Sequence, residues 1–130
     1  CNEIKETIGI LQNSIEKRIC ELKDEEIASK KSCVIVGRLS NFILKDSAFN
    51  VFLHANKEDR IKRVATRDNI SETDADKKIN RVNKERHEHC HLVTGREWGI
   101  AKHYDLSINT SLFGTENTAE YISQMAKIKF

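Results

Sequence analysis

The sequence predicts an α/β fold in which a parallel β-sheet is layered with helices. Three short segments, at 33–36, 50–55 and 105–109, are the expected strands. The first run is Cys-Val-Ile-Val, apolar on both faces, which is typical of a strand covered on both sides in a parallel sheet. Helical patterns alternate with these runs, and that alternation favours right-handed crossovers between parallel strands.

Four longer segments carry the helical patterns. Residues 3–28 have apolar side chains at spacings of three and four, which predicts one long amphipathic helix. A helix rich in Arg and Lys is expected over 57–68, and a closing helix over 115–127. The helix from 71 to about 90 has too few apolar residues for a core position, so we expect it to project into solvent or to cover a ligand.

Shorter signals connect these elements. Ser71 is the expected N-cap of the polar helix, and Asp74 stands where a capping box has its acid. We expect a short helix or turn over 39–45, a loop over 93–103, and a turn at Thr110-Ser111 after the third strand.

The composition restricts the class of protein. The chain of 130 residues has the size of one domain. Its 22 basic and 20 acidic residues leave a formal net charge of +2, which argues against a nucleic-acid binder that relies on a strongly basic face. No apolar run approaches the roughly 20 residues that span a bilayer, and no signal-peptide pattern opens the chain. We therefore expect a soluble, cytoplasmic protein without nucleic-acid or membrane partners.

A metal site and a disulfide framework are not predicted. The four cysteines form no CxxC pair. His87 and His91 share a helix face close to His89 and Cys90, but the chain has no second ligand pair at zinc-site spacing.

Basic and small polar residues follow the ends of the expected strands, where ligands collect in parallel α/β sheets. The positions are Gly37 and Arg38 after the first strand, Arg60, Arg63 and Arg67 on one helix face after the second, Asn109, Thr110 and Ser111 after the third, and Arg81, Lys84 and Arg86 on the polar helix. Because the whole chain is nearly neutral, this gathering of charge indicates a site for a small phosphorylated ligand. The alternative for the arginine helix is a solvated face paired with neighbouring acids.

The stretches CVIVGR, FLHANKEDRIKR, VNKERHEHCHLVTGREWG and YDLSINTS, in this order, resemble the bacterial cytidylate-kinase-like proteins. These are relatives of cytidylate kinase among the P-loop nucleoside monophosphate kinases. The resemblance implies one partial kinase-like domain over 1–130, with a lid at about 57–103. It also implies transfer of the γ-phosphoryl group of ATP, with Mg²⁺, to a (deoxy)cytidylate-like nucleoside monophosphate.

The resemblance also assigns roles to single residues. Gly37 and Arg38 match the monophosphate-acceptor site, and Lys84 and Arg86 match the catalytic basic positions of the lid. The ATP-binding positions are Arg60 and Arg63, which with Glu58 match the pattern that opens the lid, and Asn109 and Thr110, which with Ser111 resemble the Asp-Ser-Thr after the last strand.

Departures from the family pattern leave other interpretations open. Val36 and Asn109 stand where cytidylate kinases have Asp, and Asn83 where the lid has an acid. No G-x-x-x-x-G-K-[ST] loop occurs in the 130 residues, so we expect the strand that carries it to be missing before Cys1 and the 130 residues alone to be inactive. One alternative is a non-catalytic nucleotide-binding or regulatory protein. Another is an interaction protein whose helix over 3–28 packs against a second copy in a homodimer.

Overall fold

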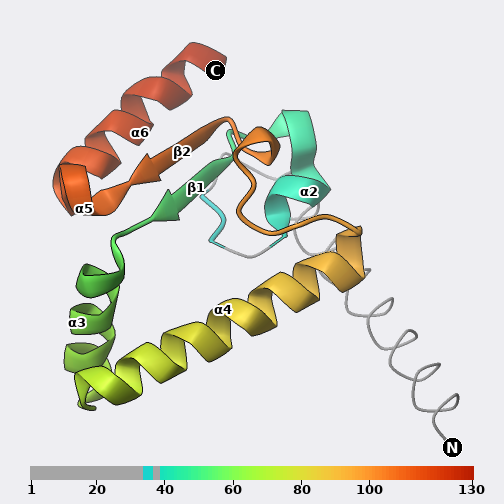
Figure 1. Ribbon diagram of the computed structural model, residues 1–130. Helices are drawn as coiled ribbons and strands as arrows, with labels where there is room; N and C mark the ends of the chain where they lie inside the picture. Colours follow the sequence, from blue (N-terminus) through green and yellow to red (C-terminus); the bar gives the residue numbers. More distant parts are fainter. Residues whose placement is uncertain (1–33, 37–38) are drawn as a thin grey trace, which may run out of the picture. The chain divides into compact units, whose positions relative to one another are not determined.

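A computed structural model describes residues 34–36 and 39–130 (Figure 1). The elements, in chain order, are α2 Ser40–Leu44, the 3-10 turn η1 Lys45–Ser47, β1 Val51–His54, α3 Lys57–Asp68, α4 Glu72–Thr94, the 3-10 turn η2 Ala101–His103, β2 Leu106–Asn109, α5 Thr110–Phe113 and α6 Thr115–Lys129. The chain divides into two compact units. One contains the described residues up to Ala48 together with His87–Trp98, and the other contains Phe49–Arg86 and Gly99–Phe130.

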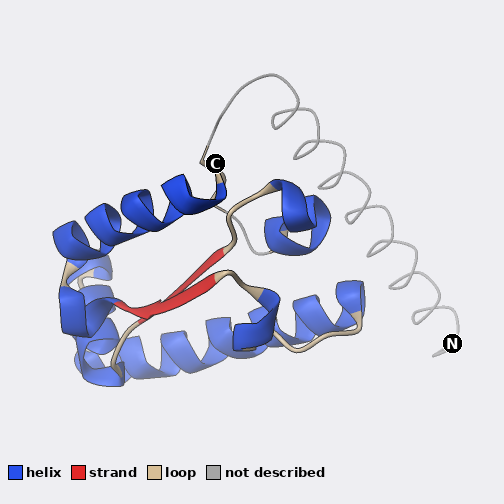
Figure 2. Cartoon of the chain, turned by 90° about the horizontal axis from the view of Figure 1, so that it is seen from above, coloured by secondary structure: helices blue, strands red, loops and turns tan. Residues whose placement is uncertain are grey.

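The sheet lies in the second unit and is parallel, as predicted. Among the described residues it consists of β1 and β2, which lie side by side with Val51 opposite Leu106 and His54 opposite Asn109 (Figure 2). Ile108 of β2 is buried. The α/β class and the parallel pairing expected from the apolar runs are therefore confirmed for these two strands.

Polar contacts fix the amino ends of both strands. The backbone N–H of Asn50 donates to Asp105 Oδ2 at 2.7 Å, and the backbone N–H of Asp105 donates to the carbonyl of Asn50, also at 2.7 Å. Lys129 at the end of α6 lies 3.4 Å from the same carboxylate. These bonds hold the register of the two strands where they begin.

Aromatic packing covers β1 next to this point. The ring of Phe52 lies 5.0 Å from that of Tyr104, centroid to centroid. Gly99 has φ +80°, and a Cβ atom there would lie 3.2 Å from Cζ of Phe52. Glycine is required at 99 both by its backbone conformation and by the close approach of this ring.

The arginine helix α3 has the predicted bounds. Glu58 and Asp59 in its first turn and Arg67 in its last turn complement the helix dipole. The helix ends at Asn69, which has the left-handed conformation φ 53°, ψ 51°. The backbone N–H of Ile70 then donates to the carbonyl of Ala65, so the chain turns directly into α4.

The polar helix α4 begins as predicted and ends later than predicted. The hydroxyl of Ser71 accepts from the N–H of Asp74 at 3.1 Å, which confirms the N-cap. Ala75 and Ile79 are buried, so the helix has a narrow core face in its first half. It continues to Thr94, past the end expected at about residue 90 and into the loop expected over 93–103, and Thr94 Oγ1 bonds the carbonyl of Cys90 within the last turn.

Thr110 and Ser111 do not form a simple turn, contrary to prediction. They begin the short helix α5, because the Asn109 side chain caps the N–H of Ser111 at 3.0 Å. Gly114, at φ 76°, separates α5 from α6. The buried hydroxyl of Thr118 then bonds the carbonyl of Gly114, and α5 contacts both β1 and α6.

The strand expected over 33–36 is not present in its described part. Residues 34–36 have no regular secondary structure, and the side chains of Val34 and Val36 are 94% and 97% exposed. A strand exists only where another strand completes its ladder, and no described strand pairs with these residues. The helix expected over 3–28, with its proposed homodimer seam, lies outside the described residues, as do Cys33, Gly37 and Arg38.

In the described part of the chain, no helix combines the length and the apolar character that crossing a bilayer requires.

Candidate functional site

The carboxyl edge of the sheet collects polar side chains from two distant parts of the chain. Because β1 and β2 are parallel, both end at this edge, with His54 opposite Asn109. Asn56 follows β1 directly and precedes α3, while Thr110 and Ser111 follow β2 and open α5. The edge therefore joins the start of the arginine helix to the end of the last strand.

Four hydrogen bonds connect these side chains. Asn109 Nδ2 donates to Asn56 Oδ1 at 3.1 Å, while Asn109 Oδ1 accepts from the N–H of Ser111. The N–H of Asn56 donates to Ser111 Oγ at 2.8 Å, and Thr110 Oγ1 donates to the carbonyl of His54 at 3.1 Å. The side chains of Asn109 and Thr110, predicted to bind ATP, thus already have protein partners and shape this edge.

The three arginines of α3 differ in their surroundings. Arg60 is half-buried, and its Nε is shielded from solvent without a hydrogen-bond partner among the described residues. Arg63 is exposed and makes no ion pair within the described part of the chain. Arg67 donates from Nε to Asp68 at 2.8 Å and from Nη2 to the other carboxylate oxygen at 3.2 Å. The alternative of a solvated, acid-paired face therefore describes Arg67 but not Arg60 or Arg63.

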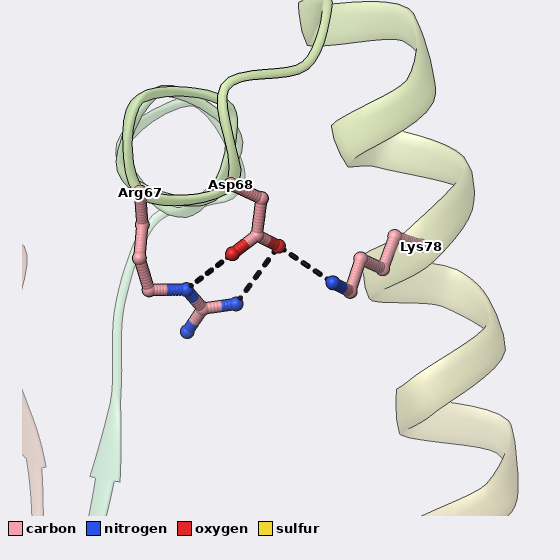
Figure 3. Close-up of polar contacts among 3 residues, drawn as sticks. All are labelled: Arg67, Asp68 and Lys78. Carbon is pink, nitrogen blue, oxygen red and sulfur yellow. Dashed lines mark hydrogen bonds and ion pairs between the residues drawn. The ribbon is translucent and has the colours of Figure 1, made fainter.

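Asp68 joins α3 to α4 through its carboxylate (Figure 3). Besides Arg67 it accepts a bond from Lys78 Nζ at 2.6 Å. The hydrogen bond from Arg67, followed by that from Lys78, holds the pKa of Asp68 well below its usual range. A second ion pair links the same helices, with Lys57 Nζ 3.0 Å from Asp76 Oδ1. The corner between the two helices is thus fixed by charge as well as by the Asn69 turn.

The remaining predicted residues lie on α4 or outside the described part. Lys84 is exposed and Arg86 half-buried. Both belong to the compact unit that also contains α3, Asn109 and Thr110, so the structure places six of the eight predicted site residues in one unit. The other two, Gly37 and Arg38, lie outside the described residues.

The described residues contain no group of three or more His, Cys, Asp or Glu side chains that could hold a metal ion. In particular, the cluster around Cys90 on α4 does not form one: Cys90 is buried, and its sulfur lies 3.6 Å from Thr94 Oγ1.

Two residues of this region were not predicted from the sequence. Asn56 had a usable signal, since it is a polar residue between a buried strand and a helix and therefore a candidate N-cap. The sequence carried no signal for the role of Asp68. Its bond to Lys78 joins residues ten apart across the boundary between two helices, and the geometry of that boundary depends on the left-handed conformation of Asn69.

Known proteins are similar to this chain in sequence. The profile of the cytidylate kinase-like family matches residues 5–112. The cytidylate kinase of Thermococcus kodakarensis is 33% identical over 74% of this chain and 51% of its own length. The cytidylate kinase of Archaeoglobus fulgidus is 27% identical over 88% of this chain and 64% of its own length. That of Ignicoccus hospitalis is 30% identical over 95% of this chain and 77% of its own length.

A crystal structure of an uncharacterized protein from Eubacterium ventriosum has the same fold. It superimposes with a TM-score of 0.76 at 24% identity, covering 88% of this chain and 64% of that one. The chain thus spans about half to two-thirds of the first two curated relatives named above. The match over residues 5–112 includes β1, α3, α4 and β2. On this evidence the chain belongs to the cytidylate kinase-like family.

Proposed function

We propose that this chain carries the lid and part of the nucleotide site of a nucleoside monophosphate kinase. The reaction would transfer the γ-phosphoryl group of ATP to a cytidylate or deoxycytidylate-like acceptor. Membership of the cytidylate kinase-like family supports the reaction class. The observation that carries the site is the shielded Nε of Arg60, without an acceptor among the described residues, on the helix that begins at the carboxyl edge of the sheet. Because the chain spans only part of its relatives, the activity is proposed for the whole protein.

Each residue has a separate task in this proposal. Arg60 and Arg63 hold ATP at the start of the lid, the segment at about 57–103. Lys84 and Arg86 neutralise the charge that develops on the transferred group when the lid closes and excludes water. Gly37 and Arg38 hold the acceptor phosphate. The protein then contributes positioning and charge, with no covalent nucleophile.

The surroundings of Arg60 support an anionic ligand. A buried N–H without an acceptor costs roughly 1–3 kcal/mol, and Nε of Arg60 is such a group among the described residues. A phosphate oxygen would satisfy it with a charge-assisted hydrogen bond. The described residues offer no acidic cluster for Mg²⁺, so we propose that the ion arrives bound to the phosphates of ATP, whose charge it neutralises.

An acceptor panel tests the proposal. ADP release from ATP is measured on the whole protein with CMP, dCMP, UMP and AMP, and we expect the two cytidylates to be preferred. In the same assay Arg63→Ala should lower kcat/KM on the order of 100-fold. Lys62→Ala removes an exposed cation from the neighbouring position of α3 and should change kcat/KM less than twofold. Equal effects of the two substitutions would contradict the assignment of Arg63.

The second candidate, a nucleotide-binding protein without transfer, gives a different result in this experiment. ATP would bind, Arg63→Ala would weaken binding, and no ADP would form with any acceptor. The absence of a G-x-x-x-x-G-K-[ST] loop from the 130 residues favours this outcome for the chain by itself.

A further inference from the structure

The side chain of Asn56 does not cap α3, although the residue occupies the N-cap position of that helix. Asn is among the preferred N-cap residues because its side chain accepts from an N–H in the first helical turn. At the start of α3 that bond is not formed, although Asn56 has the extended backbone of an N-cap, φ −60° and ψ 147°. Its Oδ1 instead accepts from Asn109, 53 residues away in the sequence.

The backbone of Asn56 adds two further bonds. Its N–H donates to Ser111 Oγ, and its carbonyl accepts from the N–H of Arg60 at 3.1 Å in the first bonded turn of α3. Asn56 is therefore bonded on one side to the residues that end β2 and on the other to the helix that bears Arg60 and Arg63. Since the proposed lid begins at residue 57, this contact lies directly before it.

We infer that Asn56 is a positioning residue: it anchors the start of α3 to Asn109 and Ser111, and so sets where the arginines of α3 meet the nucleotide. The inference rests on the proposed function for its effect on the nucleotide, and on the two hydrogen bonds that join Asn56 to Asn109 and Ser111 for the anchoring itself. Thr110 strengthens the same junction through the carbonyl of His54. Any closing of the lid then takes place with the first residues of α3 held at the sheet.

The test compares three variants. Asn56→Ala removes Oδ1, whereas Asn56→Asp keeps an acceptor for Asn109 at the same place. Asn80→Ala is the matched control, because it also removes one exposed amide bond, from Asn80 Nδ2 to Asp76 at 3.4 Å, in the same compact unit. The readouts are the KM for ATP, kcat, the Tm, and amide hydrogen exchange at Arg60 and Ser111.

We expect Asn56→Ala to raise the KM for ATP about fivefold, the loss of one ordinary hydrogen bond, with a smaller change in kcat. Exchange at the Arg60 and Ser111 amides should become faster. Asn56→Asp should restore both the KM for ATP and these exchange rates to near their wild-type values. Asn80→Ala should change neither. The double variant Asn56→Ala/Asn109→Ala should raise KM less than the product of the two single effects, because both remove the same bond.

Two results would overturn the inference. Unchanged exchange at Arg60 and Ser111 in Asn56→Ala would disprove the anchoring, whether or not the protein is a kinase. A wild-type KM in Asn56→Ala, with faster exchange, would make Asn56 structural only. Failure of the proposed function is recognised separately, because the wild-type protein would then form no ADP with any acceptor, while the exchange readout would still decide the anchoring.

Discussion

At the scale of single residues, two independent features of position 99 disfavour any residue other than glycine. Its φ of +80° is unfavourable for any residue with a Cβ atom, and that atom would also lie 3.2 Å from the ring of Phe52. Gly95 has a similar φ of +69°, but a Cβ there would have no neighbour within 4 Å. Substitutions at the two positions can therefore separate the cost of backbone strain from the cost of steric overlap.

Gly99→Ala should lower the free energy of unfolding more than Gly95→Ala does. Strain alone is worth about 1–2 kcal/mol, and at 99 the shift of Phe52, which packs on Tyr104, adds to it. Urea denaturation of both variants measures the difference. Equal losses would show that Phe52 accommodates the methyl group without cost.

The carboxylate of Asp68 should make the stability of the fold depend on pH. Its pKa in the folded chain is depressed by the bonds from Arg67 and Lys78, so the carboxylate stabilises the fold at pH values above its ordinary pKa of about 4. That contribution is lost as the pH falls below about 4, because the unfolded chain then binds the proton more readily.

Asp68→Asn should therefore be less stable than wild type at pH 7, and its stability should depend less on pH between 7 and 3. Urea denaturation at several pH values in this range checks the prediction. Lys78→Gln, which removes one of the two donors, should give an intermediate slope. Parallel curves for wild type and Asp68→Asn would mean that the ion pairs seen at this corner contribute nothing in solution.

At the scale of elements, the periodic and local signals in the sequence predicted β1, β2, α3 and the start of α4, but the apolar run at 33–36 forms no strand in its described part. The segments at 50–55 and 105–109 indicated β1 and β2, and the segment rich in Arg and Lys over 57–68 indicated α3. The start of α4 was predictable because Ser71 is an N-cap by chemistry alone. The short helix α5 was not, since it depends on Asn109 turning its amide towards Ser111 rather than towards solvent.

Ser71→Ala should destabilise the protein by about 1 kcal/mol, the usual cost of losing an N-cap. Ser71→Asp, which keeps an acceptor for the N–H of Asp74, should restore most of that loss. Thermal unfolding followed by circular dichroism distinguishes the variants. If Ser71→Asp were as unstable as Ser71→Ala, the hydroxyl would not be acting as the cap of α4.

At the scale of the whole molecule, the sequence indicated the fold class and the gathering of basic residues, but not their partners. Arg60 and Arg67 look equivalent in a helical pattern, yet Arg67 pairs with Asp68 whereas Nε of Arg60 is buried without an acceptor among the described residues. Arg67 pairs with the next residue of the same helix, whereas the shielding of Arg60 Nε depends on side-chain packing that helical periodicity does not encode.

The central claim is that nucleotide meets the start of α3 and the carboxyl edge of the sheet. An ATP titration followed by amide NMR tests it directly on the protein, with sodium phosphate at matched ionic strength as the control. We predict that the shifts concentrate at residues 56–63 and 109–111, and that Arg63→Ala weakens them while Lys62→Ala does not. Shifts confined to other residues, or equal shifts with phosphate alone, would contradict the account.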